Sequence, residues 1–156
     1  MKIQSERFGN FEVDDTDALQ FPEGIVGFPS ERSFVLLRHR EGSPIAWLQS
    51  SVTPALAFPV VSVDALALER PYSAAVRHSG DESNPHAVMA VLCAPAGQVA
   101  TVNLLAPIVV NVTTRVGAQI FLEEGAYSTT ERFALREHPV RPADAAVFAS
   151  PAAAAP

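Results

Sequence analysis

The sequence contains very little cysteine, lysine or charge. Cys93 is the only cysteine, which excludes an internal disulfide framework and is typical of a protein kept in a reducing compartment. Lys2 is the only lysine, charged residues make up 18% of the chain, and the formal net charge is −6. Because phosphate binding depends on grouped lysine and arginine, we expect no direct binding of nucleic acid. An acidic chain is better suited to a basic protein partner.

Long hydrophobic runs are also missing. No apolar run reaches the roughly 18 residues that a membrane-spanning helix needs, and the first ten residues, MKIQSERFGN, contain no apolar segment typical of a signal peptide. We therefore expect a cytoplasmic protein that does not enter a membrane. Hydrophobic residues still make up 48% of the 156 residues, which is enough to build the core of one domain.

Patterns of catalytic or metal-binding residues are absent as well. The acidic segment DDTD at 14–17 lacks the glycine and the distant glutamate of a calcium loop, so we interpret it as a solvated turn. Cys93 lies in an apolar run and is predicted to be buried and inert. No nucleophile, phosphate-loop or dinucleotide motif is present, so we predict neither an enzyme nor a cofactor. The histidines are too scattered to predict a zinc site; they are His39, His78, His86 and His138.

Short apolar runs separated by turn residues make up most of the chain. They predict an all-β fold, mainly antiparallel, forming a small β-barrel-like or sandwich domain with at most short helices. Residues 2–13 should form a hairpin that turns at Gly9-Asn10. Residues 14–32 are expected to be an ordered loop or a bulged strand edge. The other expected strands lie at 33–40, 44–52, 56–63 and 86–94, with two or three more within 99–122.

Proline and alanine mark the less regular parts of the chain. Pro59 cannot donate to a strand ladder, which predicts an edge or a bulge in its strand. Pro71 would interrupt a short helix within 64–78. Residues 1–137 are therefore assigned to the β domain, and the Ala/Pro-rich residues 138–156 to a disordered tail. The alternative for part of the tail is a frayed helix over 142–149.

Three carboxamides lie within the apolar stretch TVNLLAPIVVNVTTRVGAQIF at 101–121. An amide left unpaired in an apolar interior costs on the order of 1–3 kcal/mol, so each one must bond an internal partner or face outward. We expect Asn103 to be structural, and we expect Pro107 and Gly117 to mark bends. For Asn111 and Gln119, a structural role and a contact with a partner protein both remain open.

Two further segments allow two readings each. In the loop FPEGIVGF at 21–28, the glycines could form a bend that packs Phe21 and Phe28 into the core, or the loop could form a rim that contacts a partner. In the strand WLQS, Gln49 alternates with the apolar Leu48 and could therefore face outward. Trp47 could be structural or could line a pocket, and the latter keeps a small-molecule-binding β-barrel as an alternative function.

Several of these stretches together resemble the family of the flagellar assembly factor FliW. The resemblance covers roughly residues 2–130 and is most specific in TVNLLAPIVVN. It implies a cytoplasmic β protein that binds newly made flagellin. It also implies binding of the RNA-binding translational regulator CsrA, in hosts that use this circuit, so that flagellin and CsrA compete for the protein. The matching stretches are FPEGIVGF, PIAWLQS, LAFPVVSV, ATVNLLAPIVVN and GAQIFLEEGAYS.

The predicted site residues follow from both lines of argument. We predict structural roles for Trp47, Asn103 and Pro107. The predicted contacts with protein partners are Phe21, Pro22, Gly24, Gly27, Phe28, Gln49, Asn111, Gln119 and Tyr127.

Overall fold

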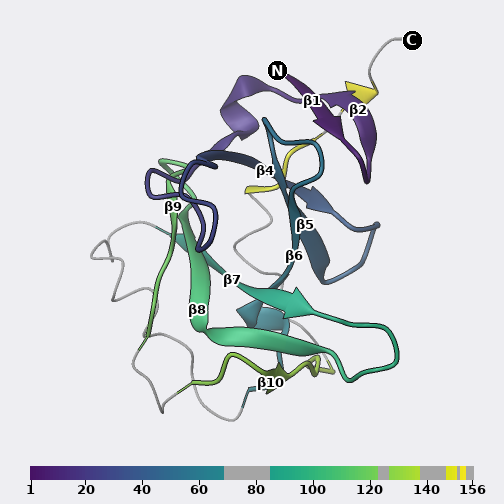
Figure 1. Ribbon diagram of the computed structural model, residues 1–156, viewed down its shortest axis with the longest axis vertical. Helices are drawn as coiled ribbons and strands as arrows, with labels where there is room; N and C mark the ends of the chain where they lie inside the picture. Colours follow the sequence, from purple (N-terminus) through teal and green to yellow (C-terminus); the bar gives the residue numbers. More distant parts are fainter. Residues whose placement is uncertain (69–84, 123–126, 138–146, 151, 154–156) are drawn as a thin grey trace.

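The fold consists of two β-sheets. The computed structural model describes residues 1–68, 85–122, 127–137, 147–150 and 152–153. The smaller sheet has the order β1-β2-β11, and its hairpin lies at the opposite end of the molecule from β10 (Figure 1). Its strands are β1 (Lys2–Ser5), β2 (Gly9–Glu12) and β11 (Ala152–Ala153).

The larger sheet has eight strands in the order β10-β8-β7-β6-β5-β4-β3, and β9 also pairs with β8. All of its strand pairs are antiparallel. The strands are β3 (Leu19–Gln20), β4 (Ser33–Arg38), β5 (Ile45–Ser50), β6 (Ala57–Ser62), β7 (His86–Cys93), β8 (Thr101–Asn111), β9 (Gly117–Gln119) and β10 (Glu131–Arg132). The prediction of a mainly antiparallel all-β fold is therefore confirmed.

The helical segments of the described part are two single turns of 3-10 helix, η1 (Asp15–Asp17) and η2 (Val63–Ala65). η1 falls within the acidic segment that was predicted to be a turn. η2 overlaps only the beginning of the helix predicted over 64–78, and residues 69–84 lie outside the described residues. None of the described helices is long and apolar enough to cross a bilayer.

The larger sheet curls until its two ends approach each other. The backbone N–H of Gln20 in β3 donates to the carbonyl of Arg115, 2.9 Å away, just before β9. An isolated parallel bridge joins Gln20 to Val116 at the same place. Because this link is a single bridge, the sheet is barrel-like without being a closed barrel.

The N-terminal hairpin forms as predicted, but its turn lies earlier. Ser5 pairs with Gly9, so the turn consists of residues 6–8. The hydroxyl of Ser5 accepts hydrogen bonds from the backbone N–H groups of Arg7 and Phe8, at 3.2 and 3.0 Å. Gly9 follows the turn with a φ of +76°, a conformation that favours glycine. The glycine signal was therefore correct, and the position assigned to the turn was wrong.

The two strand prolines lie inside long strands, at points where a missing N–H costs little. Pro59 pairs with Trp47 of β5, while the pairing of β6 with β7 begins only at Val60. Pro59 is thus at a local edge, although β6 itself is an inner strand. Pro107 lies inside the single eleven-residue strand β8, in a stretch where the register with β7 is interrupted. Pro107 was expected to mark a bend, and the structure places it at an interruption of the register within one continuous strand.

The core lies between the curled strands and is filled by side chains. Its largest cluster combines residues from most strands of the larger sheet with Val147 from the C-terminal region. Val147 is fully buried, so a disordered tail from residue 138 onward does not describe residues 147–150. One aliphatic and one aromatic side chain, Val147 and Phe148, give this Ala-rich stretch enough apolar area to pack. The rest of the predicted tail, including 142–146 of the alternative helix, lies outside the described residues except for Ala152–Ala153.

Cys93 also differs from its prediction. It is the last residue of β7, and its side chain is exposed. Cys93 still pairs with Thr101 of β8, so its exposure is that of a side chain at the end of the strand and not of a residue that has left the sheet.

Candidate partner-binding site

The loop at 21–28 is a compact double turn. The N–H of Gly24 donates to the carbonyl of Phe21 at 2.9 Å, which closes the first turn. Ile25 and Phe28 then exchange two backbone hydrogen bonds, of 3.2 and 2.6 Å, and form a miniature hairpin with Val26 and Gly27 at its tip. The loop therefore has a defined shape without belonging to a regular sheet.

Glycine at position 24 is required by space as well as by conformation. Gly24 has a φ of +68°, and a Cβ added there would lie 2.4 Å from the carbonyl oxygen of Phe28. Any side chain would push the second turn of the loop away from the first. Gly27, with a φ of +85°, has open space around it, so its requirement is conformational only.

Gln119 of β9 holds the loop against the sheet. Its Oε1 accepts a hydrogen bond from the N–H of Val26 at 2.9 Å, and its Nε2 donates to the carbonyl of Ala106 in β8 at 3.1 Å. One half-buried amide thus connects the tip of the loop to the interrupted part of β8. Figure 1 shows the loop beside β9. The amide therefore positions the loop, and both its oxygen and its nitrogen are hydrogen-bonded to groups of the same chain.

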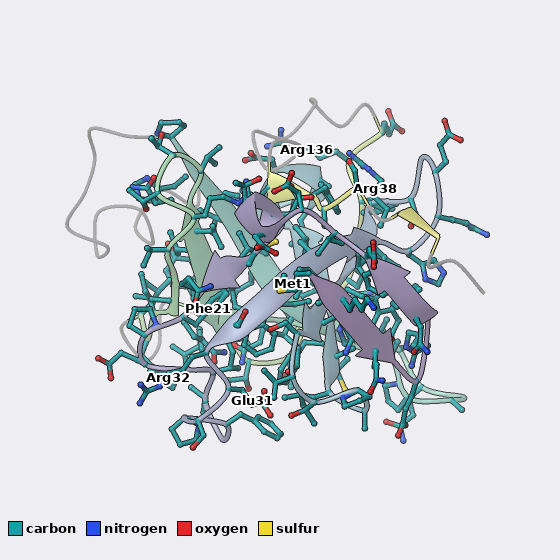
Figure 2. All side chains as sticks on the ribbon, turned by 90° about the horizontal axis from the view of Figure 1, so that it is seen from above. Met1, Phe21, Glu31, Arg32, Arg38 and Arg136 are labelled. Atoms are coloured by element: carbon teal, nitrogen blue, oxygen red, sulfur yellow. The ribbon has the colours of Figure 1, made fainter. Side chains whose placement is uncertain are left out.

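Aromatic rings connect the loop to the core. Phe21 packs edge-to-face against Phe34 with centroids 5.3 Å apart, and Phe28 packs in the same way against Phe58 at 5.5 Å. Phe34 and Phe58 are themselves 6.3 Å apart, so the four rings form one chain. In Figure 2, Glu31 and Arg32 lie at the periphery of the molecule near Phe21. Glu31 fixes the end of this segment by accepting hydrogen bonds from Ser50 and Thr53.

Apolar side chains remain exposed on this braced loop and at the two ends of β9, the strand that holds it. Val26 is 55% exposed and Phe28 is 40% exposed. Val116 and Phe121, which flank β9 on either side, are 42% and 61% exposed. We call these four residues the apolar rim. Large exposed apolar side chains on a rigid support are typical of protein-binding surfaces.

The rim includes residues that the sequence reasoning did not select. Val26 lies between the two glycines of a predicted exposed bend, which is a usable signal for an exposed apolar side chain. Val116 and Phe121 lacked such a signal, because strand alternation alone does not say which face of β9 is covered. Of the predicted contacts, Phe28, Pro22 and Gly27 are exposed on the loop, while Gly24 is buried inside it.

Three further predicted contacts, besides Gly24, are buried in the structure. Phe21 and Gln49 have no exposed surface, and Asn111 is 7% exposed. Phe21 and Gln49 therefore present no surface for direct contact in this structure, and their contact with a partner stays a prediction. Phe21 is held in the core by its contact with Phe34. Asn111 closes the turn between β8 and β9, since its Oδ1 accepts from the N–H groups of Thr113 and Thr114 at 2.9 and 3.0 Å.

Gln49 organises the turn that follows β5. Its Oε1 accepts a hydrogen bond of 2.8 Å from the hydroxyl of Ser5, which connects the two sheets. Its Nε2 faces several carbonyl oxygens, and the closest are those of Ser50 and Leu56, both at 3.1 Å. Those of Thr53 and Pro54 are at 3.4 Å. A buried amide with these partners is explained without any external ligand.

Asn103 lies at the interruption between β7 and β8. Met89 pairs with Ile108 and Val91 pairs with Asn103, so the single residue between the two pairs on β7 faces residues 104–107 on β8. The Oδ1 of Asn103 accepts from the N–H groups of Leu105 and Ala106, at 3.1 and 3.0 Å. These bonds replace the ladder partners that the extra residues lack.

Trp47 and Tyr127 are both half-buried. The indole N–H of Trp47 donates to Nδ1 of His39 at 3.0 Å, and the guanidinium of Arg7 lies 3.8 Å from the centroid of a Trp47 ring. Tyr127 packs against two hydrophobic clusters, which include Val102 and Leu122. Each aromatic side chain is thus partly covered by its own chain.

Within the described residues, the hollow beside Gln49 gives little support for a small-molecule site. The hollow, of about 390 Å³, is open to solvent, and its lining includes Gln49, whose polar groups are already bonded. Trp47 does not belong to this lining; the other lining residues are Glu6, Arg7, Pro54, Ala55 and Ala57. The interior of the larger sheet is occupied by the main core cluster.

The titratable groups of the described residues form no metal-binding cluster, and the shifted pKa of Asp14 has a structural cause. No group of histidine, cysteine or carboxylate side chains within the described ranges could hold a metal ion. The backbone N–H and then the hydroxyl of Thr16 donate to the carboxylate of Asp14 and hold its pKa below the usual value. Asp14 caps η1 in this way, so its lowered pKa has a structural cause.

Comparisons with known proteins agree on one family. A family model described as FliW protein matches residues 2–133. The flagellar assembly factor FliW of Heliobacterium modesticaldum is 42% identical over 139 residues, covering 85% of this chain and 90% of that protein. The FliW of Desulfitobacterium hafniense strain DCB-2 is 39% identical and covers 82% and 88%. A crystal structure of the flagellar assembly factor FliW superimposes with a TM-score of 0.69 at 32% identity, covering 85% of this chain and 96% of that one.

Proposed function

Since this chain belongs to the FliW family of flagellar assembly factors, we propose that it is a cytoplasmic protein that binds flagellin and antagonises the translational regulator CsrA. Members of this family are protein-binding factors and not enzymes. In the proposed scheme, CsrA represses the translation of flagellin. The protein binds CsrA away from the RNA-binding surface and relieves the repression. Flagellin competes for the protein, so accumulated flagellin frees CsrA and stops further synthesis.

The observation that carries the proposal is the apolar rim. Val26 and Phe28 stand on a loop whose shape is fixed by Gly24 and whose tip is bonded to Gln119. A rigid loop loses little conformational entropy when a partner covers it, so its exposed apolar area contributes more fully to affinity. We assign the rim as the surface that contacts flagellin. Pro22 and Gly27 are exposed on the same loop, and Gln119 positions it.

The charge of the chain supports the choice of partners. With a net charge of −6 and one lysine, the protein has little attraction for RNA itself. It can instead approach a basic RNA-binding regulator by electrostatic attraction. Glu23 and Arg32 are exposed near the ends of the loop, so the apolar rim has polar neighbours, as protein interfaces usually do.

The first experiment measures flagellin binding by calorimetry with purified full-length proteins. We expect wild-type protein to bind monomeric flagellin and Val26→Asp to bind at least tenfold more weakly. Val52→Asp is the matched control, because Val52 is 77% exposed on a different turn. The assignment of the rim is contradicted if both variants bind like wild type, and the proposed function is contradicted if wild-type protein does not bind flagellin.

The second experiment tests the CsrA arm. A labelled flagellin leader RNA bound to CsrA is titrated with the protein and followed by a mobility shift. We expect release of the RNA without any complex between the RNA and the protein alone. A shift of the RNA by the protein alone, or RNA that stays bound to CsrA at saturating protein, would contradict this part of the proposal.

A further inference from the structure

The C-terminal residues complete an edge of the larger sheet that β3 leaves open. β3 pairs only with Ser33 and Phe34 at the beginning of β4. Further along this strand, Phe148 forms a parallel bridge with Leu36, and the N–H of Ala149 donates to the carbonyl of Leu36 at 2.9 Å. Phe148 and Ala149 thus lie along the remaining edge of β4 and pair with it through one bridge.

The same segment continues to the smaller sheet. Ala152 pairs with Glu12 and Ala153 pairs with Phe11, which adds β11 to the edge of β2. One short stretch of chain therefore covers exposed edges of both sheets. Figure 1 shows this C-terminal stretch, in yellow, running beside the strands and reaching β2 near the N-terminal end of the fold.

The side chains of the segment enter a socket with three distinct positions. Val147 is fully buried in the main core cluster, and Ala149 is 7% exposed in the cluster that contains Val35 and Leu37. Phe148, between them, is half-buried, and the guanidinium of Arg38 lies 4.1 Å from its ring centroid. The socket thus accepts an aliphatic, an aromatic and a small residue in that order.

Polar groups fix the backbone of the segment at its start. Nη2 of Arg115 donates to the carbonyl of Val147 at 3.0 Å and to the carbonyl of Asp17 at 3.1 Å. Arg115 itself has a φ of +62°, which is uncommon for a residue with a side chain. The bond to Val147 recognises a main-chain carbonyl, so the backbone of another peptide could accept it, while the bond to Asp17 holds the guanidinium in place.

The segment is not part of the region shared with the family. The family model ends at residue 133, whereas the strand edge, Arg38 and Arg115 all lie within it. Alanine and proline, which make up most of 149–156, add little apolar area and favour strands poorly. Few side chains therefore hold the segment in place, and such elements open at a lower free energy than the core.

We propose that the edge of β4, together with Arg38 and Arg115, is a peptide-binding socket that residues 147–149 occupy as an internal competitor. Its external ligand is an extended protein segment with the pattern aliphatic–aromatic–small, which adds to β4 as a strand. Such a ligand must displace the C-terminal segment. Its apparent affinity is therefore its intrinsic affinity multiplied by the fraction of protein molecules whose socket is empty. This socket is independent of the apolar rim and of the function proposed above.

The test uses full-length protein and a labelled peptide with the sequence of residues 147–153, VFASPAA, followed by fluorescence anisotropy. In the double variant Val147→Ala/Phe148→Ala the internal competitor is weakened. We expect it to bind the peptide at least tenfold more tightly than wild type. The control Val52→Ala/Val99→Ala changes two exposed apolar residues elsewhere and should bind like wild type. Equal affinity of wild type and the first variant overturns the proposal, as does no binding by either.

A second measurement needs no variant and covers the case in which the double variant fails to fold. In wild-type protein, hydrogen exchange at the amide of Ala149 reports whether the segment opens on its own. We expect its protection factor to be at least tenfold below those of the paired amides of β7 and β8. Equal protection would mean that the segment opens only with global unfolding, and the socket could then not be vacated for a ligand.

Discussion

Substitution of Gln49 by alanine should destabilise the fold without removing a binding contact. The side chain makes one hydrogen bond with Ser5 and two short ones with the carbonyls of Ser50 and Leu56. At about 1 kcal/mol net for each bond, their loss amounts to about 3 kcal/mol. Water from the adjoining hollow can solvate some of the hydroxyl and carbonyl groups that lose their partner, which reduces the loss of stability. The cavity left by the missing side chain increases the loss. We therefore expect a decrease of about 2–4 kcal/mol in the free energy of unfolding.

The assay is thermal unfolding followed by circular dichroism, with urea unfolding as a check. For a chain of this size, about 2–4 kcal/mol corresponds to a decrease of roughly 4–16 °C in Tm. Gln4→Ala is the matched control, because Gln4 is an exposed glutamine in a strand and its loss should change stability by less than about 0.5 kcal/mol. If Gln49→Ala shifts Tm no more than Gln4→Ala, the hydrogen-bond argument is refuted.

Three other predictions concern single side chains. Asn103→Ala should cost about 1–2 kcal/mol in unfolding experiments, and Asn103→Asp should restore most of it at neutral pH, because only an acceptor oxygen is needed there; an Asp variant no better than Ala would contradict the role of that oxygen. Gly117→Ala should cost about 1–3 kcal/mol by the same measurement, since its Cβ would lie 2.7 Å from the ring of Phe21; wild-type stability would show that the ring moves aside freely. In an NMR titration, the carboxyl of Asp14 should lose its charge below the usual aspartate range, and Thr16→Val should raise its pKa while leaving the backbone bond; an unchanged titration in the variant would contradict the contribution of the hydroxyl.

The architecture followed from the sequence because strand signals are local. Alternating or continuous apolar runs bounded by turn residues identified β4 to β8 within a few residues. The prolines located interruptions of a strand ladder, but a residue without an N–H does not say which neighbouring strand fails to pair there. Pro59 and Pro107 both lie inside strands at places where one ladder is interrupted. Which ladder is interrupted depends on the pairing and register of the neighbouring strands, which one apolar run does not show.

The site was harder to predict than the fold. A glutamine in a strand has the same local pattern whether it faces a partner or its own chain, and Gln49 faces four carbonyls of its own following turn. Burial of Val147 depends on an open edge of β4 that lies more than a hundred residues earlier in the chain. Alanine-rich composition alone therefore misjudged this part of the C-terminal region.

The most direct test of the proposed partner switching is a competition measurement. Fluorescently labelled CsrA is saturated with this protein, and monomeric flagellin is then added while anisotropy is recorded. We expect flagellin to release CsrA in a concentration-dependent manner, with Val26→Asp protein requiring at least tenfold more flagellin than Val52→Asp protein. If labelled CsrA never binds the protein, or if it stays bound at saturating flagellin, the account of a protein that exchanges one partner for another is contradicted.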